Sequence, residues 1–242
     1  MPRPFTRFWL GATDWFWPRT CFLCGGRITD DRSLCVCRGC DVELTADPHP
    51  ACPRCSSTVG PHADTGDGCP ACRTSTFRFR GVTRLGVYEG KLREAVLKAK
   101  QPGGDGVAEA LGRLFAAARE PALLADRPDV IVPVPLHWRR RWGRGHNQAE
   151  GIARGLSDGL RVPVRRALWR VKHTRLQSAG SRERRWANAA GAFRAVPWGG
   201  VPGLRVLLVD DVLTTGATAD AAAEALRRVG AAQVHVAVLA HR

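Results

Sequence analysis

The sequence predicts an α/β fold, in which a parallel sheet with flanking helices is preceded by a small cysteine-rich domain. Two observations lead to this prediction. All nine cysteines of the 242-residue chain lie between Cys21 and Cys72, in a segment without sustained helical or strand periodicity. Beyond Phe77 there are no cysteines, and apolar runs of strand length alternate with helical stretches, as in a parallel sheet. The hydrophobic content of 44% is typical of a globular protein and excludes wholesale disorder.

We expect three parts: an aromatic helix at the N-terminus (residues 1–20), the cysteine-rich domain (21–76) and the α/β domain (77–242). Aromatic residues of the first part fall at helical spacing, so this helix either packs on the rest of the protein or docks onto a membrane surface or a partner. The sequence has no run of about 18 apolar residues that would form a transmembrane helix. Because the N-terminal stretch also lacks the continuous apolar region of a secretory signal, we expect a cytoplasmic location.

Eight of the cysteines form four C-x-x-C pairs. They are Cys21/Cys24, Cys37/Cys40, Cys52/Cys55 and Cys69/Cys72, with Cys35 left over. Two residues between the thiolates let both sulfurs bind one metal ion. Gaps of 12 and 13 residues suit two consecutive four-cysteine sites, although interleaved pairing stays open. The segment lacks the βαβ context of a redox motif, which leaves an iron–sulfur cluster as the alternative. We therefore predict two structural Zn²⁺ ions, which makes this domain a double zinc ribbon.

The C-terminal segment predicts a strand, a loop and a helix in succession. An apolar run over residues 204–209 is typical of a buried parallel strand, and it ends in Asp210 and Asp211. A Thr/Gly loop then leads into an alanine-rich helix over residues 219–229, and another strand follows around residues 234–238. Open α/β sheets bind ligands at the carboxyl ends of their strands, which is where this loop lies.

The residues around this loop suit a phosphorylated sugar. Thr214, Thr215, Gly216 and Thr218 offer hydroxyl and backbone N–H groups at the start of a helix, where anions bind. The two carboxylates before them would repel a phosphate, but they suit sugar hydroxyls or a Mg²⁺ ion. A phosphorylated sugar meets both demands at once.

The sequence LVDDVLTTGAT (residues 208–218) resembles the phosphoribosyl-pyrophosphate (PRPP) signature of type I phosphoribosyltransferases. The resemblance implies their fold, a Rossmann-like parallel sheet with flanking helices, and a Mg²⁺ ion that binds together with PRPP. It also implies that Asp210 and Asp211 hold the ribose hydroxyls. The residues implied to hold the 5′-phosphate are Thr214, Thr215, Gly216, Ala217 and Thr218. The implied reaction is transfer of the phosphoribosyl group from PRPP to an acceptor.

The chain is most similar to one group of these proteins, the ComF (ComFC-like) competence family, which combines a phosphoribosyltransferase domain with an N-terminal zinc ribbon. The similarity is carried by Tyr88-x-Gly90-x-Leu-Arg93, by VPVPLHWRRRWGRGHNQAE (132–150), and by Thr174, Gln177, Ser181, Arg182, Arg185 and Asn188. The sequence departs from the usual pattern at Ala99, His146 and Gly180. The resemblance implies a role in the uptake or processing of single-stranded DNA during natural transformation. A DNA-translocating ATPase of the competence machinery is the partner that it implies.

The positive charge of the chain is concentrated in one segment. The net charge is +15, and residues 131–200 hold 15 Lys and Arg against 3 Asp and Glu. Here a strand is expected over residues 130–134, and arginines follow before a helix that Asn147 caps with Glu150 as its reciprocal partner. Arginine binds pyrophosphate through paired hydrogen bonds, so this loop is either a pyrophosphate site or simply solvated. The candidate pyrophosphate residues are Pro135, Leu136, His137, Arg139 and Arg140.

A second basic segment, residues 172–188, corresponds by resemblance to the mobile loop that closes over PRPP. Its candidate catalytic side chains are Lys172, Arg182 and Arg185, in addition to Asp210 and Asp211. Tryptophans are interleaved with the arginines of both basic segments, at Trp138, Trp142, Trp169 and Trp186. Single-stranded nucleic acid binds to such a combination by stacking and phosphate contacts, whereas the other interpretation is that the rings pack on the sheet.

The sequence therefore leaves three functions open. The first is a PRPP-binding phosphoribosyltransferase that acts in DNA uptake. The second is a non-catalytic protein that binds single-stranded DNA or serves as an adaptor for a helicase-like partner. The third is a phosphoribosyltransferase of nucleotide salvage. The acceptor pocket has no signature that the sequence would reveal.

Overall fold

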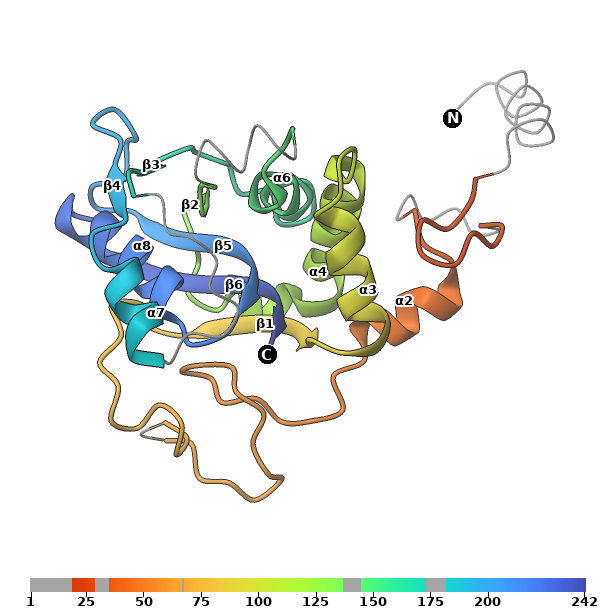
Figure 1. Cartoon of the computed structure of the whole chain (residues 1–242), viewed down its shortest axis with the longest axis horizontal. Helices are drawn as coiled ribbons and strands as arrows, with labels where there is room; N and C mark the ends of the chain where they lie inside the picture. Colours follow the sequence, from red (N-terminus) through yellow and green to blue (C-terminus); the bar gives the residue numbers. More distant parts are fainter. Residues whose placement is uncertain (1–18, 29–34, 67, 137–144, 173–181) are drawn as a thin grey trace.

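The computed structural model describes residues 19–28, 35–66, 68–136, 145–172 and 182–242. In these residues four strands form a parallel sheet in the order β1-β6-β5-β2 (Figure 1). The strands are β1 (Val82–Val87), β2 (Val130–Pro133), β5 (Arg205–Leu213) and β6 (Gln233–His241). Every pair in this sheet is parallel, which confirms the predicted fold class.

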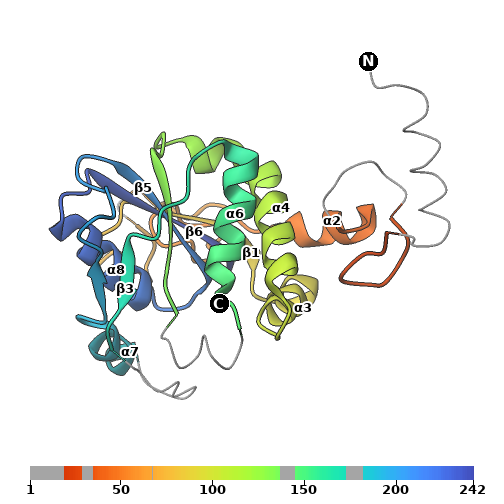
Figure 2. The same ribbon diagram turned by 90° about the horizontal axis from the view of Figure 1, so that it is seen from above.

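Helices cover both faces of the sheet (Figure 2). One face carries α3 (Gly90–Ala99), α4 (Asp105–Leu124) and α6 (Gln148–Leu160). The other face carries α8 (Ala217–Arg228), next to an antiparallel ribbon of β3 (Leu168–Arg170) and β4 (Phe193–Ala195). Helix α7 (Arg182–Ala189) lies between these two short strands in the chain, and α2 (Arg38–Thr45) belongs to the cysteine-rich segment.

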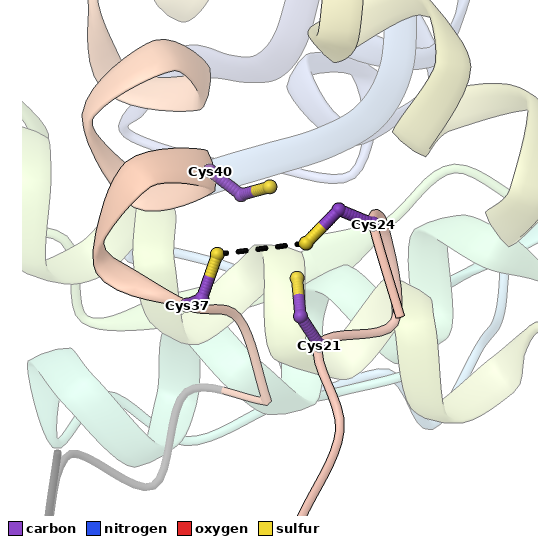
Figure 3. Close-up of side chains that lie close together, drawn as sticks. All are labelled: Cys21, Cys24, Cys37 and Cys40. Carbon is purple, nitrogen blue, oxygen red and sulfur yellow. Dashed lines mark hydrogen bonds between the residues drawn. The ribbon is translucent and has the colours of Figure 1, made fainter. Parts of the chain in front are cut away.

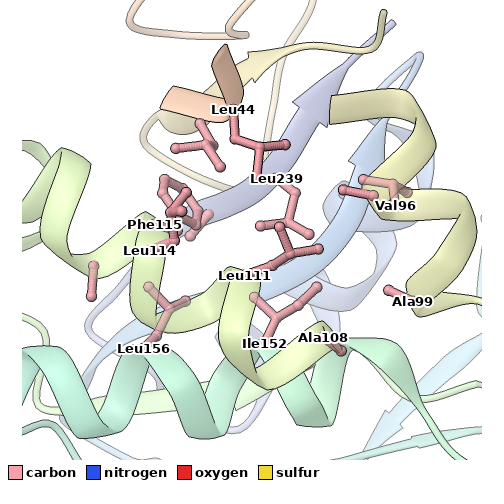
Figure 4. Close-up of a cluster of buried hydrophobic side chains, with 14 of the residues drawn as sticks. Leu44, Val96, Ala99, Ala108, Leu111, Leu114, Phe115, Ile152, Leu156 and Leu239 are labelled. Carbon is pink, nitrogen blue, oxygen red and sulfur yellow. The ribbon is translucent and has the colours of Figure 1, made fainter. Parts of the chain in front are cut away.

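The larger buried cluster fills the space between the sheet and the α3, α4 and α6 helices (Figure 4). Leu111 and Phe115 of α4 pack there against Ile152 and Leu156 of α6, and all four are fully buried. The two helices approach closely because glycines face each other. A Cβ atom on Gly155 would lie 2.1 Å from the Glu109 carbonyl oxygen, so no larger residue fits without moving a helix. This packing fixes the end of α3 and the start of α6 beside the sheet edge that carries the site.

The structure corrects two details of the sequence prediction. Strand β5 does not end at the acidic pair but continues to Leu213, because Val212 and Leu213 still pair with β6. Asn147 caps α6 as predicted, and its side chain accepts a hydrogen bond from the Ala149 amide at 3.2 Å. Glu150 is not its reciprocal partner, since the Glu150 carboxylate instead pairs with Arg166 at 2.7 Å.

A buried arginine fastens the cysteine-rich segment to the sheet. Arg84 of β1 is 3% exposed, and its guanidinium binds both carboxylate oxygens of Asp47 at 2.8 and 2.9 Å. The same guanidinium donates to the Ser56 carbonyl at 2.7 Å and to the Thr58 hydroxyl at 3.0 Å. The segment between the first and second cysteine groups is therefore tied directly to an outer strand of the sheet.

Two expectations about the ends and boundaries of the chain remain predictions. The aromatic helix of residues 1–20 lies almost entirely outside the described residues, and the division at residues 76 and 77 stays a prediction. Among the helices of the described ranges, none combines the length and the apolar character needed to cross a membrane.

Candidate functional site

The acidic pair lies near the carboxyl end of β5, in the middle of the parallel sheet. Asp210 pairs with Val238 of β6. On the other side of β5, the residue after β2 donates a hydrogen bond from the Val134 amide to the Val209 carbonyl at 2.8 Å. The chain then enters the predicted pyrophosphate loop. Burial raises the pKa of Asp210 to about 7, and the negative charge of Asp211 adds to the effect. The two carboxyl groups are therefore close enough to disfavour ionisation of both, as expected of a site that awaits a ligand.

Two cations from distant segments face this pair. Lys100, at the end of α3, forms an ion pair with Asp211 at 2.8 Å, and both side chains are largely buried. Arg170 of β3 is close enough for its charge to lower the pKa of Asp210 in part, while burial lowers the pKa of Arg170 itself. Neither residue was predicted from the sequence. Their proximity to the pair depends on the tertiary fold, so no local spacing signals it.

The end of α3 is held in place by a contact between two positions at which the sequence departs from the family pattern. The Ala99 carbonyl is 2.8 Å from His146 Nε2, just before α6 begins. This contact lies one residue before Lys100, so it positions the backbone from which that ammonium reaches Asp211.

The predicted phosphate loop follows β5 and forms the start of α8. Gly216 is the N-terminal capping residue of this helix and has φ +80°, a left-handed conformation that glycine adopts without strain. Thr215 and Thr218 are half-buried, and Thr214 is exposed. Because the first N–H groups of a helix have no partner within the helix, Ala217 and Thr218 bring backbone donors to the same place. The geometry thus agrees with an anion cradle.

Three stacked aromatic rings lie beside this loop. The Phe77 and Phe79 rings are stacked with centroids 4.6 Å apart, and Trp186 of α7 stacks on Phe77 at 6.1 Å. A Cβ atom added to Gly216 would lie 3.4 Å from the Phe77 ring, so the ring lies directly beside the loop. Trp186 therefore packs within the molecule, as one of the two interpretations of the tryptophans expects.

The other predicted residues divide between described and undescribed segments. Pro135 and Leu136 are half-buried beside the end of β2. Lys172 is exposed, and its ammonium donates to the Ala190 carbonyl at 2.7 Å, across the base of the β3–β4 ribbon. Arg185 lies half-buried in α7. The residues whose side chains lie outside the described part are His137, Arg139, Arg140 and Arg182.

The eight paired cysteines form two groups of four, and the pairing is consecutive. The first group is Cys21, Cys24, Cys37 and Cys40 (Figure 3), and the second is Cys52, Cys55, Cys69 and Cys72. Within each group all four sulfurs lie within 4.8 Å of one another. Sγ–Sγ separations of 3.6 Å in the first group and 3.5 to 3.8 Å in the second match the edge of a tetrahedron around zinc, about 3.8 Å for Zn–S bonds of about 2.3 Å.

The protein backbone favours the thiolate form of Cys52, whereas burial raises the pKa of Cys55 and Cys72 in the same group. Burial disfavours the Cys52 thiolate, but backbone N–H groups of Cys55, Cys69 and Arg54 outweigh this effect and lower the pKa of Cys52 to about 7. Thiolates are the form that binds zinc. Both groups are therefore compatible with structural zinc, and the interleaved pairing that the sequence left open does not occur.

Comparison with known proteins identifies the relatives of this chain. A sequence model of the phosphoribosyl transferase domain matches residues 150–242. Competence protein F of Haemophilus influenzae is 31% identical over 221 residues, which cover 89% of this chain and 94% of that protein. The chain belongs to the ComF family.

Further members of the ComF family have similar coverage. The DNA utilization protein YhgH of Escherichia coli K12 is 32% identical over 208 residues, which cover 83% of this chain and 88% of that protein. Competence protein ComFC of Bacillus subtilis is 26% identical over 225 residues, covering 88% and 90%. The parallel sheet and the family match together confirm a phosphoribosyltransferase fold that follows a cysteine-rich segment.

Proposed function

We propose that this ComF-family chain binds PRPP with Mg²⁺ at the carboxyl edge of its sheet. The observation that carries the proposal is the arrangement of one strand and one loop. The carboxylates of Asp210 and Asp211 immediately precede the glycine-containing helix start at 214–218. A sugar phosphate is a ligand of the right chemistry, because its hydroxyls suit the carboxylates and its phosphate suits the loop.

The chain's own residues would divide the ligand between them. Asp210 and Asp211 would accept hydrogen bonds from the ribose hydroxyls, and Thr214 to Thr218 would hold the 5′-phosphate through hydroxyl and N–H donors. Lys100 and Arg170 would balance the charge of the acidic pair. Bound with PRPP, Mg²⁺ would neutralise the pyrophosphate and help it to leave. Lys172, Arg182 and Arg185 would contribute from the segment that precedes β4.

Whether the phosphoribosyl group is then transferred depends on an acceptor. A phosphoribosyltransferase that acts in DNA uptake and one that acts in nucleotide salvage both fit the site. Binding of PRPP is common to both, and it is therefore the step to test first.

Calorimetric titration with PRPP and Mg²⁺ tests the proposal. We expect the native chain to bind, and Asp210→Asn and Asp211→Asn to weaken binding by about tenfold or more, since a hydrogen bond to a charged group contributes about 1.5–3 kcal/mol. Asp158→Asn is the matched control, because Asp158 pairs with Arg113 on the far side of α6. If the native chain releases no heat of binding, the PRPP proposal fails.

We also propose that each cysteine group holds one structural Zn²⁺ ion. The support is the tetrahedral spacing of the sulfurs and the scarcity of other buried residues in the second group. Elemental analysis of the purified chain should find two zinc ions per molecule. A chain that folds and contains no zinc would reject the assignment.

A second candidate function, binding of single-stranded DNA, is favoured by an exposed aromatic pair. Trp169 of β3 is 52% exposed and Trp198 is 77% exposed, and their rings meet edge to face with centroids 5.7 Å apart. Arg194 lies directly opposite Trp169 in the ribbon. Residues 161–200 hold ten Lys and Arg against one acidic residue. Exposed rings beside cations fit stacked bases and phosphates.

This second function is tested with a fluorescently labelled oligothymidine. We expect Trp169→Ala and Trp198→Ala to weaken binding by about five- to 100-fold, since stacking contributes about 1–3 kcal/mol per base. Trp198→Phe keeps a stacking ring and should retain most of the affinity. The logarithm of the affinity should fall with salt by about 0.7 per phosphate contacted. Unchanged affinity in both alanine variants, or a salt slope of zero, would reject this surface as a nucleic-acid site.

The cytoplasmic location and the DNA-translocating ATPase partner remain predictions.

A further inference from the structure

The second cysteine group and the phosphate loop lie against each other, although about 140 residues separate them in the sequence. A cavity of about 30 Å³ lies between them. Cys55 and Cys72 line one side of it, and Thr214, Thr215 and Gly216 line the other. The volume is room for about one water molecule, and residues of both segments line it. The first cysteine group packs beside α3 instead.

Phe77 connects the two walls. Its ring packs against the cysteine cluster of the second group and also lies beside Gly216, where an added Cβ atom would be 3.4 Å from the ring. Gly216 is where the loop turns into α8 with a left-handed backbone, so a ring at this point supports the residue that fixes the direction of the helix. Phe77 lies five residues after Cys72, and its position therefore follows that of the cysteine turn.

Arg54 holds Phe77 to the cysteine group. It lies between Cys52 and Cys55, and its guanidinium donates to the Cys72 carbonyl at 3.3 Å and to the Ser75 carbonyl. The same guanidinium carbon lies 5.8 Å from the centre of the Phe77 ring, a cation–π arrangement. The turn that contains Cys52 and Cys55 thus fixes the segment that follows Cys72.

The following residue joins the start of α8. The Arg78 amide donates to a carboxylate oxygen of Asp220 at 2.6 Å, in the first turn of the helix. The segment of residues 77–78 therefore places a ring beside the loop and forms a hydrogen bond with the helix. A displacement of this segment would move both parts of the anion cradle.

The second group has little to hold it together other than a metal ion. Its buried apolar cluster consists of the four cysteines themselves, with Val59 and Phe77 half-buried beside them. Small segments without an apolar core depend on metal binding for their folding free energy. Four thiolates at this spacing would also repel one another without a cation.

From these contacts we infer that the second cysteine group, when it holds its metal ion, positions the phosphate loop through Phe77. The phosphate loop then adopts its binding conformation only when the second group holds its metal ion. Metal in the first group does not affect the conformation of the loop. Phe77 is a positioning residue, because it acts on the loop backbone and not on the ligand. The inference relies on the proposed function only for the identity of the ligand.

Hydrogen–deuterium exchange of the full chain tests this inference without any ligand. We compare native protein with Cys72→Ser, with Phe77→Leu and with the matched control Cys24→Ser in the first group. Both cysteine variants should lose one of two zinc ions by elemental analysis. Amides of residues 213–218 should exchange at least tenfold faster in Cys72→Ser and in Phe77→Leu, and at the native rate in Cys24→Ser. Native exchange of these amides in Cys72→Ser would overturn the inference.

Phe77→Leu covers the case in which Cys72→Ser does not fold, because it leaves all eight cysteines in place and should keep both zinc ions. Phe115→Leu is its control, since Phe115 is a fully buried ring on the opposite face of the sheet. It should lower the free energy of unfolding but leave exchange at residues 213–218 unchanged. Equal loop exchange in the two phenylalanine variants would overturn the role of Phe77.

Affinity for PRPP with Mg²⁺ supplies the second measurement. It should fall at least tenfold in Cys72→Ser and Phe77→Leu and stay native in Cys24→Ser. If the native chain does not bind PRPP, the proposed function fails, but the exchange rates still decide whether the cysteine group positions the loop. Faster loop exchange together with native affinity in Phe77→Leu would overturn the statement that this position matters for binding.

Discussion

The two carboxyl groups of the acidic pair lie in different surroundings. Asp211 has a cation, Lys100, at 2.8 Å. Asp210 is half-buried, and desolvation together with the charge of Asp211 raises its pKa to about 7. An empty site at neutral pH therefore holds Asp210 in a mixture of protonated and ionised forms. A ligand whose hydroxyls bind the carboxylate favours ionisation, so the protonation of one residue links ligand affinity to pH.

This linkage predicts the pH dependence of PRPP binding. Because the ionised form of Asp210 binds the ribose hydroxyls, affinity should rise with pH up to about 7 and then level off, changing by at most tenfold per pH unit below 7. Asp210→Asn should remove this dependence and leave only the contribution of the ligand's own phosphates. Calorimetric titrations between about pH 5.5 and pH 8.5 measure both profiles. A native profile as flat as that of the variant would contradict the prediction.

Lys100 should shift this profile. Its charge lowers the pKa of Asp210 in part, so Lys100→Met should move the midpoint of the pH profile upward and weaken binding at pH 7. Lys98→Met is the matched control. Lys98 lies on the same helix, but its ammonium donates to the Phe22 and Leu23 carbonyls instead of facing the pair. A midpoint that is the same in both lysine variants would show that Lys100 does not act on the pair.

At the scale of the elements, Gly216 fixes how β5 passes into α8. An alanine at φ +80° is strained by about 1–2 kcal/mol, and its Cβ would also lie 3.4 Å from the Phe77 ring. Gly216→Ala should therefore lower the free energy of unfolding by about this amount and weaken PRPP binding. Gly203→Ala is the matched control, since Gly203 has φ +77° with nothing near its added Cβ. Both variants should lose stability, and native affinity in Gly216→Ala would contradict the loop's role.

The elements of the site were predictable where the signal is local. The apolar run before Asp210 and the alanine-rich stretch after Thr218 predicted β5 and α8, with errors of a few residues at their ends. The end of β5 was placed too early because polar residues normally mark the end of a buried strand. Here, backbone pairing with β6 continues through the acidic pair. Spacing of four cysteine pairs likewise predicted both metal groups.

Residues that meet only through the tertiary fold were not predictable. Lys100 and Asp211 are more than 100 positions apart, and Lys100 alone resembles an ordinary surface charge. The sequence marks Phe77 only as the point where the cysteine-rich pattern ends. Its position beside Gly216 depends on where the tertiary fold places the segment after Cys72. Trp169 and Trp186 have similar sequence surroundings, yet one is exposed and the other stacks on Phe77.

At the scale of the whole molecule, both cysteine groups are built onto the sheet domain and not attached by a free linker. Lys98 joins the first group to α3, whose last turn leads to Lys100. Arg84 joins Asp47, before the second group, and Ser56, within it, to β1. The first group is thus attached to a helix of the sheet domain and the second to a strand. Ten of the fifteen Lys and Arg of residues 131–200 fall within residues 161–200, the stretch of sequence that contains β3, α7 and β4.

Arg84 should be among the strongest single contacts between the two halves. Its side chain is 1% exposed and that of Asp47 is 9% exposed. Removing one partner of a buried pair costs about 3–5 kcal/mol, because the remaining charge stays buried without compensation. Arg84→Met should therefore lower the free energy of unfolding of the zinc-loaded chain by about this amount in urea. Arg228→Met, which breaks a pair on the exposed surface of α8, should cost less than about 1 kcal/mol.

The double variant Arg84→Met/Asp47→Leu separates the charge from the packing. It removes the buried carboxylate together with its cation, so it should recover part of the stability that Arg84→Met loses. The Ser56 carbonyl loses its donor in both variants, which is why recovery should be incomplete. If Arg84→Met were no more destabilising than Arg228→Met, this ion pair would not be among the contacts that hold the two halves together. The second cysteine group would then keep its place under the phosphate loop without this ion pair.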